Sequence, residues 1–350
     1  MTNKEKELSI IVPIFNGNKY IDNLINNIAD LNRDINYEII LINDNSKDDS
    51  KLACENVINS NLNIDITLIN NETNIGVAES RNKGLEVAKG KYITFIDQDD
   101  TLSKGYLPFI NILNNDEDID FLYSNYSISS NNKVHNISIN TIDKLCEKEE
   151  IVKLERYLFN PNTFPINDNY SIKSSIWNCI FRKDFINNNN LKFFRYTSYE
   201  DDWLFLIESL KYANSIYLSK DYYYCWVIHD NNESKHNKYI KDYFKKSLKL
   251  LEYAIDSLKQ TGLSDEDLFI YKCHSNRTIL LWCFYNECER KANLHNNSNI
   301  DELMNYYHSS IKDFIKISNI IDKTMLILIS LKFYYLAKLI QLNILKRKYV

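Results

Sequence analysis

The sequence predicts an α/β domain with a doubly wound sheet, followed by a region built of helices alone. Three observations support this prediction. Short, β-branched, nearly continuous apolar runs recur through the first hundred residues. Amphipathic stretches with helical spacing separate these runs, and from about residue 236 only the helical spacing remains. Runs without polar alternation are typical of strands buried on both faces of a parallel sheet, and their alternation with helices is typical of the doubly wound class.

Four strands and three helices are expected in the N-terminal third. The expected strands are LSIIVPIF (8–15), YEIILIND (37–44), IDITLIN (64–70) and KYITFID (91–97). The helices are expected at 19–31, 48–58 and 77–89, where apolar residues recur every three or four positions. In such a sheet ligands bind beyond the carboxyl ends of the strands, so the residues just after each strand are the candidate functional residues.

The C-terminal part is expected to form a separate helical domain, 236–350, after an α/β domain of residues 1–235. Ser264 and Asp267 have the spacing of a capping box and predict the start of one helix. Residues 323–350 contain six Lys or Arg residues and no Asp or Glu. We therefore expect the tail, about 320–350, to be a basic amphipathic helix in a membrane interface. A packed terminal helix or a contact between two copies of the chain is the alternative.

The amino-acid composition limits the classes of function and the cellular compartment to be expected. The chain has 42 Lys and Arg against 47 Asp and Glu, a net charge of −5, which provides no overall attraction to nucleic acid. Its seven Cys residues are scattered without a CxxC pair, which argues against a disulfide framework or a structural zinc site and favours a reducing compartment. The apolar run near the N-terminus is too short for a signal peptide or a spanning helix, so we expect a cytoplasmic protein.

Acidic and amide side chains gather at the predicted strand ends. Asp44 ends the second strand, and Asp97 to Asp100 follow the fourth. Neither of the two common glycine-rich phosphate loops follows the first strand. The D-x-D spacing alone is uninformative, because residues 116–120 repeat it in a polar stretch. Asp97 and Asp99 differ because they leave a buried strand at the ligand edge, which suggests a cation that bridges the protein to an anion.

Four segments, in order, resemble the family 2 glycosyltransferases of GT-A fold. They are SIIVPIFNGNKYIDNLINNI, YEIILINDNSKDDS, NIGVAESRNKGLEVAKGKYITFIDQDD and YEDDWLF. The resemblance covers about residues 7–235 and implies a mixed, doubly wound GT-A sheet with a Rossmann-like nucleotide-binding half. One departure is Asn45, where the family usually has Gly. Asn tolerates the left-handed backbone conformation, so the turn can be kept.

The resemblance implies a nucleotide-sugar site along the strand ends. The ring of Phe15 would offer a stacking surface to the base, or belong to the core at the strand end. Asp44 would accept a hydrogen bond from the base, or cap the following turn. Arg81 would be the cation near the phosphates. The full set of implied nucleotide-sugar contacts is Pro13, Phe15, Asn16, Asp44, Asn74, Gly76, Arg81, Asp97 and Gln98, with Asn82 in the same stretch and Asp48 as a helix N-cap.

The resemblance also implies a divalent cation. Asp97 would contact the ribose, and Asp99 would hold a Mn²⁺ or Mg²⁺ ion that bridges the two phosphates, since hard cations prefer oxygen ligands. Asp100 would support this pair. His229, in the segment YYYCWVIHDNNES, is a third candidate contact to the metal or the phosphates, and an ordinary surface His is the alternative.

The acidic cluster Glu200, Asp201 and Asp202 stands where the family places its catalytic base. We favour Asp201 with Glu200 as its partner, while aligning Trp203 with the family's aromatic residue would move the base to Asp202. An acidic first turn of a helix is compatible with both. Trp177, in SSIWNCIFRKDF, is a candidate platform for the acceptor sugar, and its alternative is a place in the core.

These features predict a metal-dependent, inverting glycosyltransferase. The donor would be a nucleotide-diphosphate sugar, most simply a UDP-sugar, and the acceptor a hydroxyl of a glycan or lipid-linked intermediate in bacterial surface polysaccharide synthesis. Expected partners are therefore the donor, the acceptor, the cytoplasmic membrane face through the tail, and a second copy of the chain, with no nucleic acid. The alternatives are a nucleotidyltransferase of similar architecture and a glycan-binding protein without catalysis.

Overall fold

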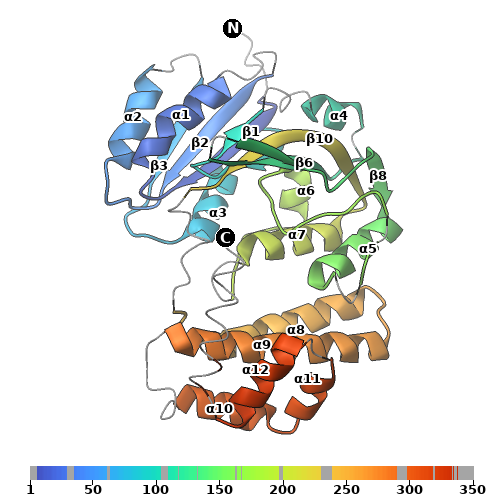
Figure 1. The fold of residues 1–350 in the computed structure, drawn as a ribbon. Coiled ribbons are helices and arrows are strands. Elements are labelled where there is room, and N and C mark those ends of the chain that lie inside the picture. Colours follow the sequence, from blue (N-terminus) through green and yellow to red (C-terminus); the bar gives the residue numbers. More distant parts are fainter. Residues whose placement is uncertain are drawn as a thin grey trace. The chain divides into compact units, whose positions relative to one another are not determined.

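The computed structural model of the protein describes most of the chain as two compact units (Figure 1). The described residues are 6–29, 35–60, 64–103, 109–116, 118–131, 133–161, 164–166, 168–196, 200–229, 239–289, 298–317, 320–332, 334 and 337. The first unit is Met1–Arg195 with Tyr199–Asp230, and the second is Tyr196–Ser198 with Asn231–Val350.

The first unit is α/β. Its strands are β1 (Leu8–Ile14), β2 (Tyr37–Asn43), β3 (Asp65–Asn70), β4 (Tyr92–Phe95), β5 (Thr101–Leu102), β6 (Phe121–Ser130), β7 (Lys133–Ile137), β8 (Lys144–Glu147), β9 (Cys179–Arg182) and β10 (Ser215–Val227). Its helices are α1 (Asn18–Ala29), α2 (Ser50–Ser60), α3 (Val77–Val87), α4 (Phe109–Asn115), α5 (Lys148–Phe159), α6 (Lys183–Asn188) and α7 (Asp201–Tyr212). The four strands and three helices predicted in the N-terminal third are all present.

One mixed sheet runs through this unit. Its strand order is β3-β2-β1-β4-β9-β6-β10-β5, with β7 paired to β6 and β8 paired to β10. The four N-terminal strands are mutually parallel, with Leu8 of β1 opposite Tyr37 of β2 and Tyr92 of β4. The antiparallel strand β9 then joins β4 to β6. This confirms the parallel sheet predicted from the apolar runs and the mixed GT-A sheet implied by the resemblance.

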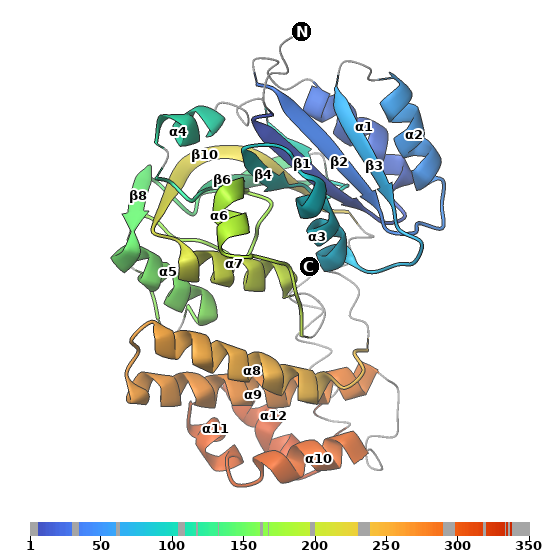
Figure 2. The same ribbon diagram turned by 180° about the vertical axis from the view of Figure 1, so that it is seen from behind.

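Helices cover both faces of the sheet, which explains why the strand sequences lack polar alternation (Figures 1 and 2). Ile10 and Val12 of β1 point into one core with α1, α2 and α4, whereas Ile11 points into the other core with α3, α5, α6 and α7. Burial on both faces leaves β1 apolar except at Ser9, which is fully buried and donates a hydrogen bond of 2.7 Å to Glu38.

Two backbone features shape the functional edge of the sheet. Asn16 and Asn45, just beyond β1 and β2, have φ angles of 50° and 53°, so Asn45 keeps the left-handed turn as predicted. On α3, a Cβ at Gly84 would lie 2.4 Å from Cγ2 of Ile11, which shows that this helix packs directly on β1. Arg81, three residues earlier on α3, is buried.

The described part of the second unit contains helices and no strand. They are α8 (Tyr243–Gln260), α9 (Asp265–Glu289), α10 (Ser298–Tyr307), α11 (Ile311–Ile317) and α12 (Ile320–Ser330). One half of the predicted capping box is present, because the Ser264 hydroxyl accepts a hydrogen bond of 3.1 Å from the Asp267 amide; the Asp267 carboxylate accepts a bond of 2.7 Å from the same hydroxyl. Among the described residues, no helix has the length and apolar composition needed to cross a membrane. Most of the predicted basic tail, including Lys338 and residues 346–348, lies outside the described residues.

Candidate active site

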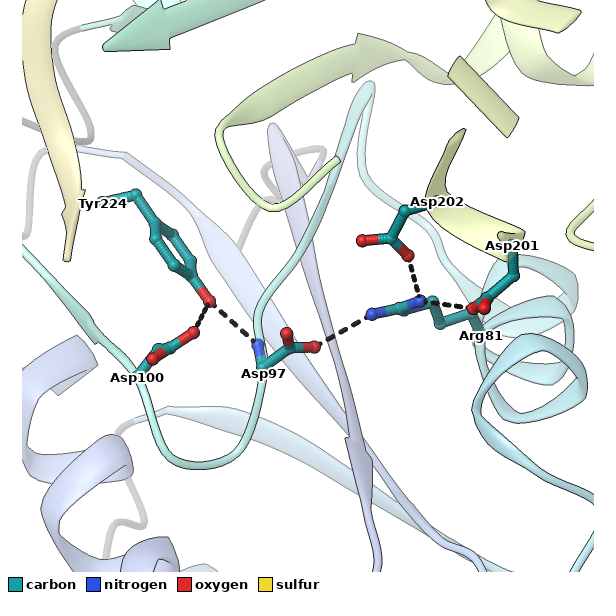
Figure 3. Close-up of polar contacts among 6 residues, drawn as sticks. All are labelled: Arg81, Asp97, Asp100, Asp201, Asp202 and Tyr224. Carbon is teal, nitrogen blue, oxygen red and sulfur yellow. Dashed lines mark hydrogen bonds and ion pairs between the residues drawn. The ribbon is translucent and has the colours of Figure 1, made fainter. Parts of the chain in front are cut away.

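One buried guanidinium brings together the two acidic clusters (Figure 3). Arg81 Nη2 lies 2.9 Å from Asp97 Oδ1, at the end of β4. Arg81 Nη1 lies 3.0 Å from Asp201 Oδ2 and 2.6 Å from Asp202 Oδ1, both in the first turn of α7. Residues that are more than a hundred positions apart in the sequence therefore meet at one side chain. These contacts bring together the two acidic clusters that the sequence analysis singled out.

The position of Arg81 differs from the expectation that it would face the phosphates. Its side chain is only 4% exposed, and its two terminal nitrogens are engaged by carboxylates. Burial alone would lower the pKa of Arg81, but the charges of Asp202, Asp97 and Asp201 outweigh burial and raise it. One cation among three carboxylates leaves an excess of negative charge, so Arg81 holds the acids together and its own charge is fully used within the protein.

Asp201 and Asp202 differ in accessibility. The Asp201 side chain is 6% exposed and the Asp202 side chain 22% exposed. Burial raises the pKa of Asp202 to about 7, with the charge of Arg81 opposing and the charges of Asp201 and Asp97 adding to this rise. Burial also raises the pKa of Asp201. A partly accessible carboxyl with a pKa near 7 is suited to accept a proton at neutral pH.

The turn after β4 places its acids in different surroundings. Both Asp100 oxygens are bound within the protein: Oδ2 accepts a hydrogen bond of 2.5 Å from the Tyr224 hydroxyl, and Oδ1 accepts one of 2.7 Å from the Val227 amide. The same Tyr224 oxygen accepts a hydrogen bond of 3.3 Å from the Asp97 amide (Figure 3). Asp100 therefore points into the protein and holds the turn.

Asp99 and His229 are neighbours. His229 Nε2 lies 3.5 Å from the Asp99 carbonyl oxygen, and the His229 ring lies 5.2 Å from that of Tyr20. The pKa of Asp99 is raised, mainly by burial and also by the charge of Asp97. The charges of His229 and Lys19 oppose this rise in part. Within the described residues, no group of three His, Cys, Asp or Glu side chains could hold a metal ion. One carboxylate and one imidazole fit a cation whose remaining ligands come from a bound diphosphate.

Asp44 organises the loop that follows β3. Its Oδ1 accepts hydrogen bonds from the Asn71 side chain at 2.9 Å and the Ile75 amide at 2.8 Å, and its Oδ2 accepts one from the Gly76 amide at 2.8 Å. The Asn74 side chain binds the Asp44 carbonyl at 3.3 Å. These bonds go to the loop after β3 and hold Asn74 and Gly76 beside the strand end, whereas in the turn directly after Asp44 the Ser46 amide donates to Asn43 Oδ1 at 3.2 Å.

Gln98 binds the backbone at the end of β1 in two places. The Phe15 amide donates to Gln98 Oε1 and Gln98 Nε2 donates to the Phe15 carbonyl, both at 3.0 Å. A Cβ at Gly17 would lie 2.0 Å from Gln98 Oε1, which explains the glycine. The Phe15 side chain is 39% exposed, so it is a surface ring and lies outside the core.

The other predicted residues mainly support the backbone. Pro13 is a β1 residue paired with Ile42, and Asn16 Oδ1 accepts a hydrogen bond of 2.8 Å from the Lys47 amide. Asn82 binds the Phe193 backbone at both its amide and its carbonyl. Glu200 stands at the N-cap of α7. These residues shape the site through the chain rather than through exposed polar groups.

Trp177, the candidate sugar platform, is half-buried and packs against the core of the first unit. Its ring stacks on Tyr224 with centroids 4.4 Å apart and meets the edge of Tyr126 at 4.8 Å. Sequence reasoning missed Tyr224, because a tyrosine in a strand carries no signal of its partner. It also missed Lys19 and Arg195, whose charges act on Asp99 and Asp201.

Comparison with known proteins gives a consistent result. A model of the family "Glycosyl transferase family 2" matches residues 9–187, just over half of the chain. The poly(ribitol-phosphate) beta-N-acetylglucosaminyltransferase TarP of Staphylococcus aureus is 26% identical over 234 residues, 66% of this chain and 65% of TarP. The Escherichia coli glucosyltransferase WfgD, which uses UDP-Glc and a diphosphoundecaprenol-linked acceptor by its name, is 30% identical over 166 residues, 45% of this chain and 64% of WfgD. The chain thus spans less than two thirds of these relatives.

A solved structure supports the fold. Residues 1–349 of S. aureus TarS, crystallised in complex with UDP-GlcNAc, superpose with a TM-score of 0.63 at 18% sequence identity. The match covers 95% of this chain and 90% of that chain. At this level of identity the likeness establishes the shared architecture, including the helical region after the sheet.

Replacing Arg81 by Met should destabilise the protein by about 3–5 kcal/mol, because three carboxylates would lose the cation between them. The loss should be larger at pH 8 than at pH 5, since protonation of the carboxyl groups relieves their repulsion at low pH. Urea unfolding of both proteins at the two pH values measures this difference. Lys51→Met, at an exposed ion pair on α2, is the control and should change stability little. An Arg81→Met loss that is equal at both pH values would contradict the electrostatic role.

Proposed function

The chain belongs to glycosyl transferase family 2, and from this membership we propose that it transfers a sugar from a UDP-sugar to a hydroxyl group in bacterial surface-glycan synthesis. The observation that carries the proposal is the meeting of Asp97, Asp201 and Asp202 at Arg81, which joins a donor-side turn to an acceptor-side helix. Both acidic clusters are intact and adjacent, which disfavours a glycan-binding protein that has lost catalysis.

The donor is proposed to bind along the carboxyl ends of β1, β2 and β4. The exposed ring of Phe15 offers a face for the nucleotide base, and the loop held by Asp44 flanks it. Asp97, whose side chain is 36% exposed, would accept a hydrogen bond from the ribose with the oxygen that Arg81 does not bind. That TarS was crystallised with UDP-GlcNAc supports a uridine nucleotide here as a proposal.

A divalent cation, Mn²⁺ or Mg²⁺, would be held by Asp99 and His229 together with the donor phosphates. Bound there, it would stabilise the negative charge that develops on the leaving diphosphate. Lys19, whose positive charge acts on Asp99, would add to the same stabilisation from the first turn of α1. The protein's own part is to fix these groups before the bond breaks.

Asp202 is proposed as the base that removes the proton from the acceptor hydroxyl. Its greater exposure supports Asp202 over Asp201, the residue first favoured from the sequence, and burial raises the pKa of both carboxyl groups. Arg81 would then orient the carboxylate and stabilise its charged form. As the proton passes to Asp202, the acceptor oxygen would bond to the anomeric carbon opposite the breaking bond to the diphosphate, which inverts that carbon, the stereochemistry that we propose.

The acceptor is proposed to be a glycan or lipid-linked intermediate at the cytoplasmic face of the membrane. By their names, TarP acts on poly(ribitol phosphate) and WfgD on a diphosphoundecaprenol-linked sugar, which supports this class of acceptor. Membrane contact through the basic tail and self-association of the chain stay predictions.

The donor experiment is a screen of UDP-sugars with released UDP as the readout. In the presence of Mn²⁺ at least one UDP-sugar should be turned over, and EDTA should abolish the reaction. Asp99→Asn should weaken Mn²⁺-dependent UDP binding by about 10-fold or more, because ligating carboxylates dominate such sites. Asp118→Asn, in the second D-x-D stretch, is the matched control and should bind as the wild type does. A chain that turns over no nucleotide sugar with either metal would overturn the proposed activity.

The base experiment compares Asp202→Asn with Asp201→Asn. Asp202→Asn should lower kcat by about 10²–10⁴-fold while UDP binding changes little, since general-base catalysis contributes this range. In the wild type, kcat/KM should fall as the pH drops below 7, because protonated Asp202 cannot accept a proton. Glu200→Gln controls for a lost charge in the same turn. A larger loss in Asp201→Asn than in Asp202→Asn would return the role to Asp201.

The tail prediction is tested by sedimentation with liposomes that contain anionic lipid. Replacing Lys346, Arg347 and Lys348 by Ala should reduce the bound fraction, since each basic residue near an anionic surface contributes about 1 kcal/mol. Liposomes of neutral lipid are the control and should bind neither protein. Equal binding of both proteins to anionic liposomes would exclude this role of the tail.

A further inference from the structure

We propose that Asp100 and Tyr224 form a buried latch, which fixes the end of β10 against the Asp97–Asp100 turn and so holds His229 beside Asp99. The proposal rests on the proposed function, because its consequence is tighter binding of the donor diphosphate together with its cation. Neither residue would touch the substrate. Asp100 and Tyr224 would act as positioning residues for Asp99 and His229, the two residues proposed to contact the cation.

The latch is made by one carboxylate and one hydroxyl that are almost fully buried. Asp100 is 3% exposed and Tyr224 is 1% exposed. The Tyr224 oxygen donates to Asp100 Oδ2 and accepts from the Asp97 amide, so it contacts both ends of the four-residue turn. Asp100 Oδ1 accepts from the amide of Val227, which lies three residues beyond Tyr224. The two bonds to Asp100 thus hold Tyr224 and Val227, at the end of β10 just before His229.

The surroundings make the latch rigid. Trp177 stacks on the Tyr224 ring with centroids 4.4 Å apart, which fixes the direction of the hydroxyl. Directly after Asp100, β5 pairs with β10, with Leu102 opposite Tyr224. On its other side β10 pairs irregularly with β6, with register shifts on both sides of Tyr222. From Tyr224 to Val227 the pairing with β6 is regular again, and the Ile228 amide donates to the Ser129 carbonyl at 2.8 Å. The side-chain bonds to Asp100 therefore tie an end of β10 that β6 already holds to the Asp97–Asp100 turn.

The position of Asp100 also argues against a direct ligand role. Both of its oxygens already accept hydrogen bonds from the protein. Burying a carboxylate has an energetic cost that only good hydrogen bonds offset, so an acid at this site needs a structural purpose. The group that the latch positions, His229, lies just after the end of β10. His229, two residues after Val227, places its Nε2 3.5 Å from the Asp99 carbonyl.

The test is UDP binding to the full chain, measured by calorimetry with Mn²⁺ and again with EDTA. Tyr224→Phe removes only the hydroxyl. It should weaken UDP binding in Mn²⁺ by about 10-fold, the usual effect of losing a group that orients a ligand residue. In EDTA the affinity should stay within about twofold of the wild type. Tyr223→Phe is the matched control, because this neighbour is equally buried in β10 and its hydroxyl bonds to the Asn178 carbonyl, away from the turn.

A double-mutant cycle with His229→Ala decides whether the effect passes through His229. If the latch acts by placing His229, Tyr224→Phe should weaken Mn²⁺-dependent UDP binding no further in the His229→Ala background. The proposal would be overturned if the fold losses in UDP affinity of the two single variants multiplied in the double variant. It would also be overturned if Tyr224→Phe lost as much UDP affinity in EDTA as in Mn²⁺. Asp100→Asn provides a second variant with the same expectation should Tyr224→Phe not fold. A wild type that binds no UDP would instead refute the proposed function itself.

Discussion

The structure of the site depends on the placement of one positive charge among three negative ones. Asp97, Asp201 and Asp202 all contact one guanidinium, and without this cation their mutual repulsion would be relieved only by protonation. Arg81 provides that cation from α3, and the close approach of α3 to β1 at Gly84 sets its depth. Packing of a helix on the sheet thereby determines where the acidic clusters meet.

The acids at the functional edge divide into two kinds. Asp44 and Asp100 have carboxylates that accept two or more hydrogen bonds from the surrounding protein, and they hold a loop and a turn in place. Asp97 and Asp202 give an oxygen to Arg81 and remain partly exposed. Asp201 combines the two features, because it is buried and also binds Arg81. Asp44 and Asp100 hold the backbone, whereas Asp97 and Asp202 keep part of their surface accessible.

The sequence predicted the parts of the site that depend on local patterns. Apolar runs located β1 to β4, and the buried strand before Asp97 distinguishes this D-x-D stretch from the one at residues 116–120. It could not predict the partners of single side chains. Arg81 binds residues about 120 positions away, and Trp177 is covered by Tyr224 from another strand. An arginine on a helix or a tryptophan in a loop has the same local pattern whether it faces a ligand or the core, so these roles required coordinates.

The chemistry of the central cation explains why it is an arginine. A lysine would supply the same charge, but its single ammonium group is a point at the end of a flexible chain. The guanidinium is planar and presents separate N–H groups in fixed directions, so Nη2 can hold Asp97 while Nη1 holds Asp201 and Asp202. The distance between the donor-side acid and the proposed base is then set by the width of one rigid group. Fixed spacing of this kind is what a transfer between two bound substrates requires, because the reacting groups must be aligned before the bond breaks.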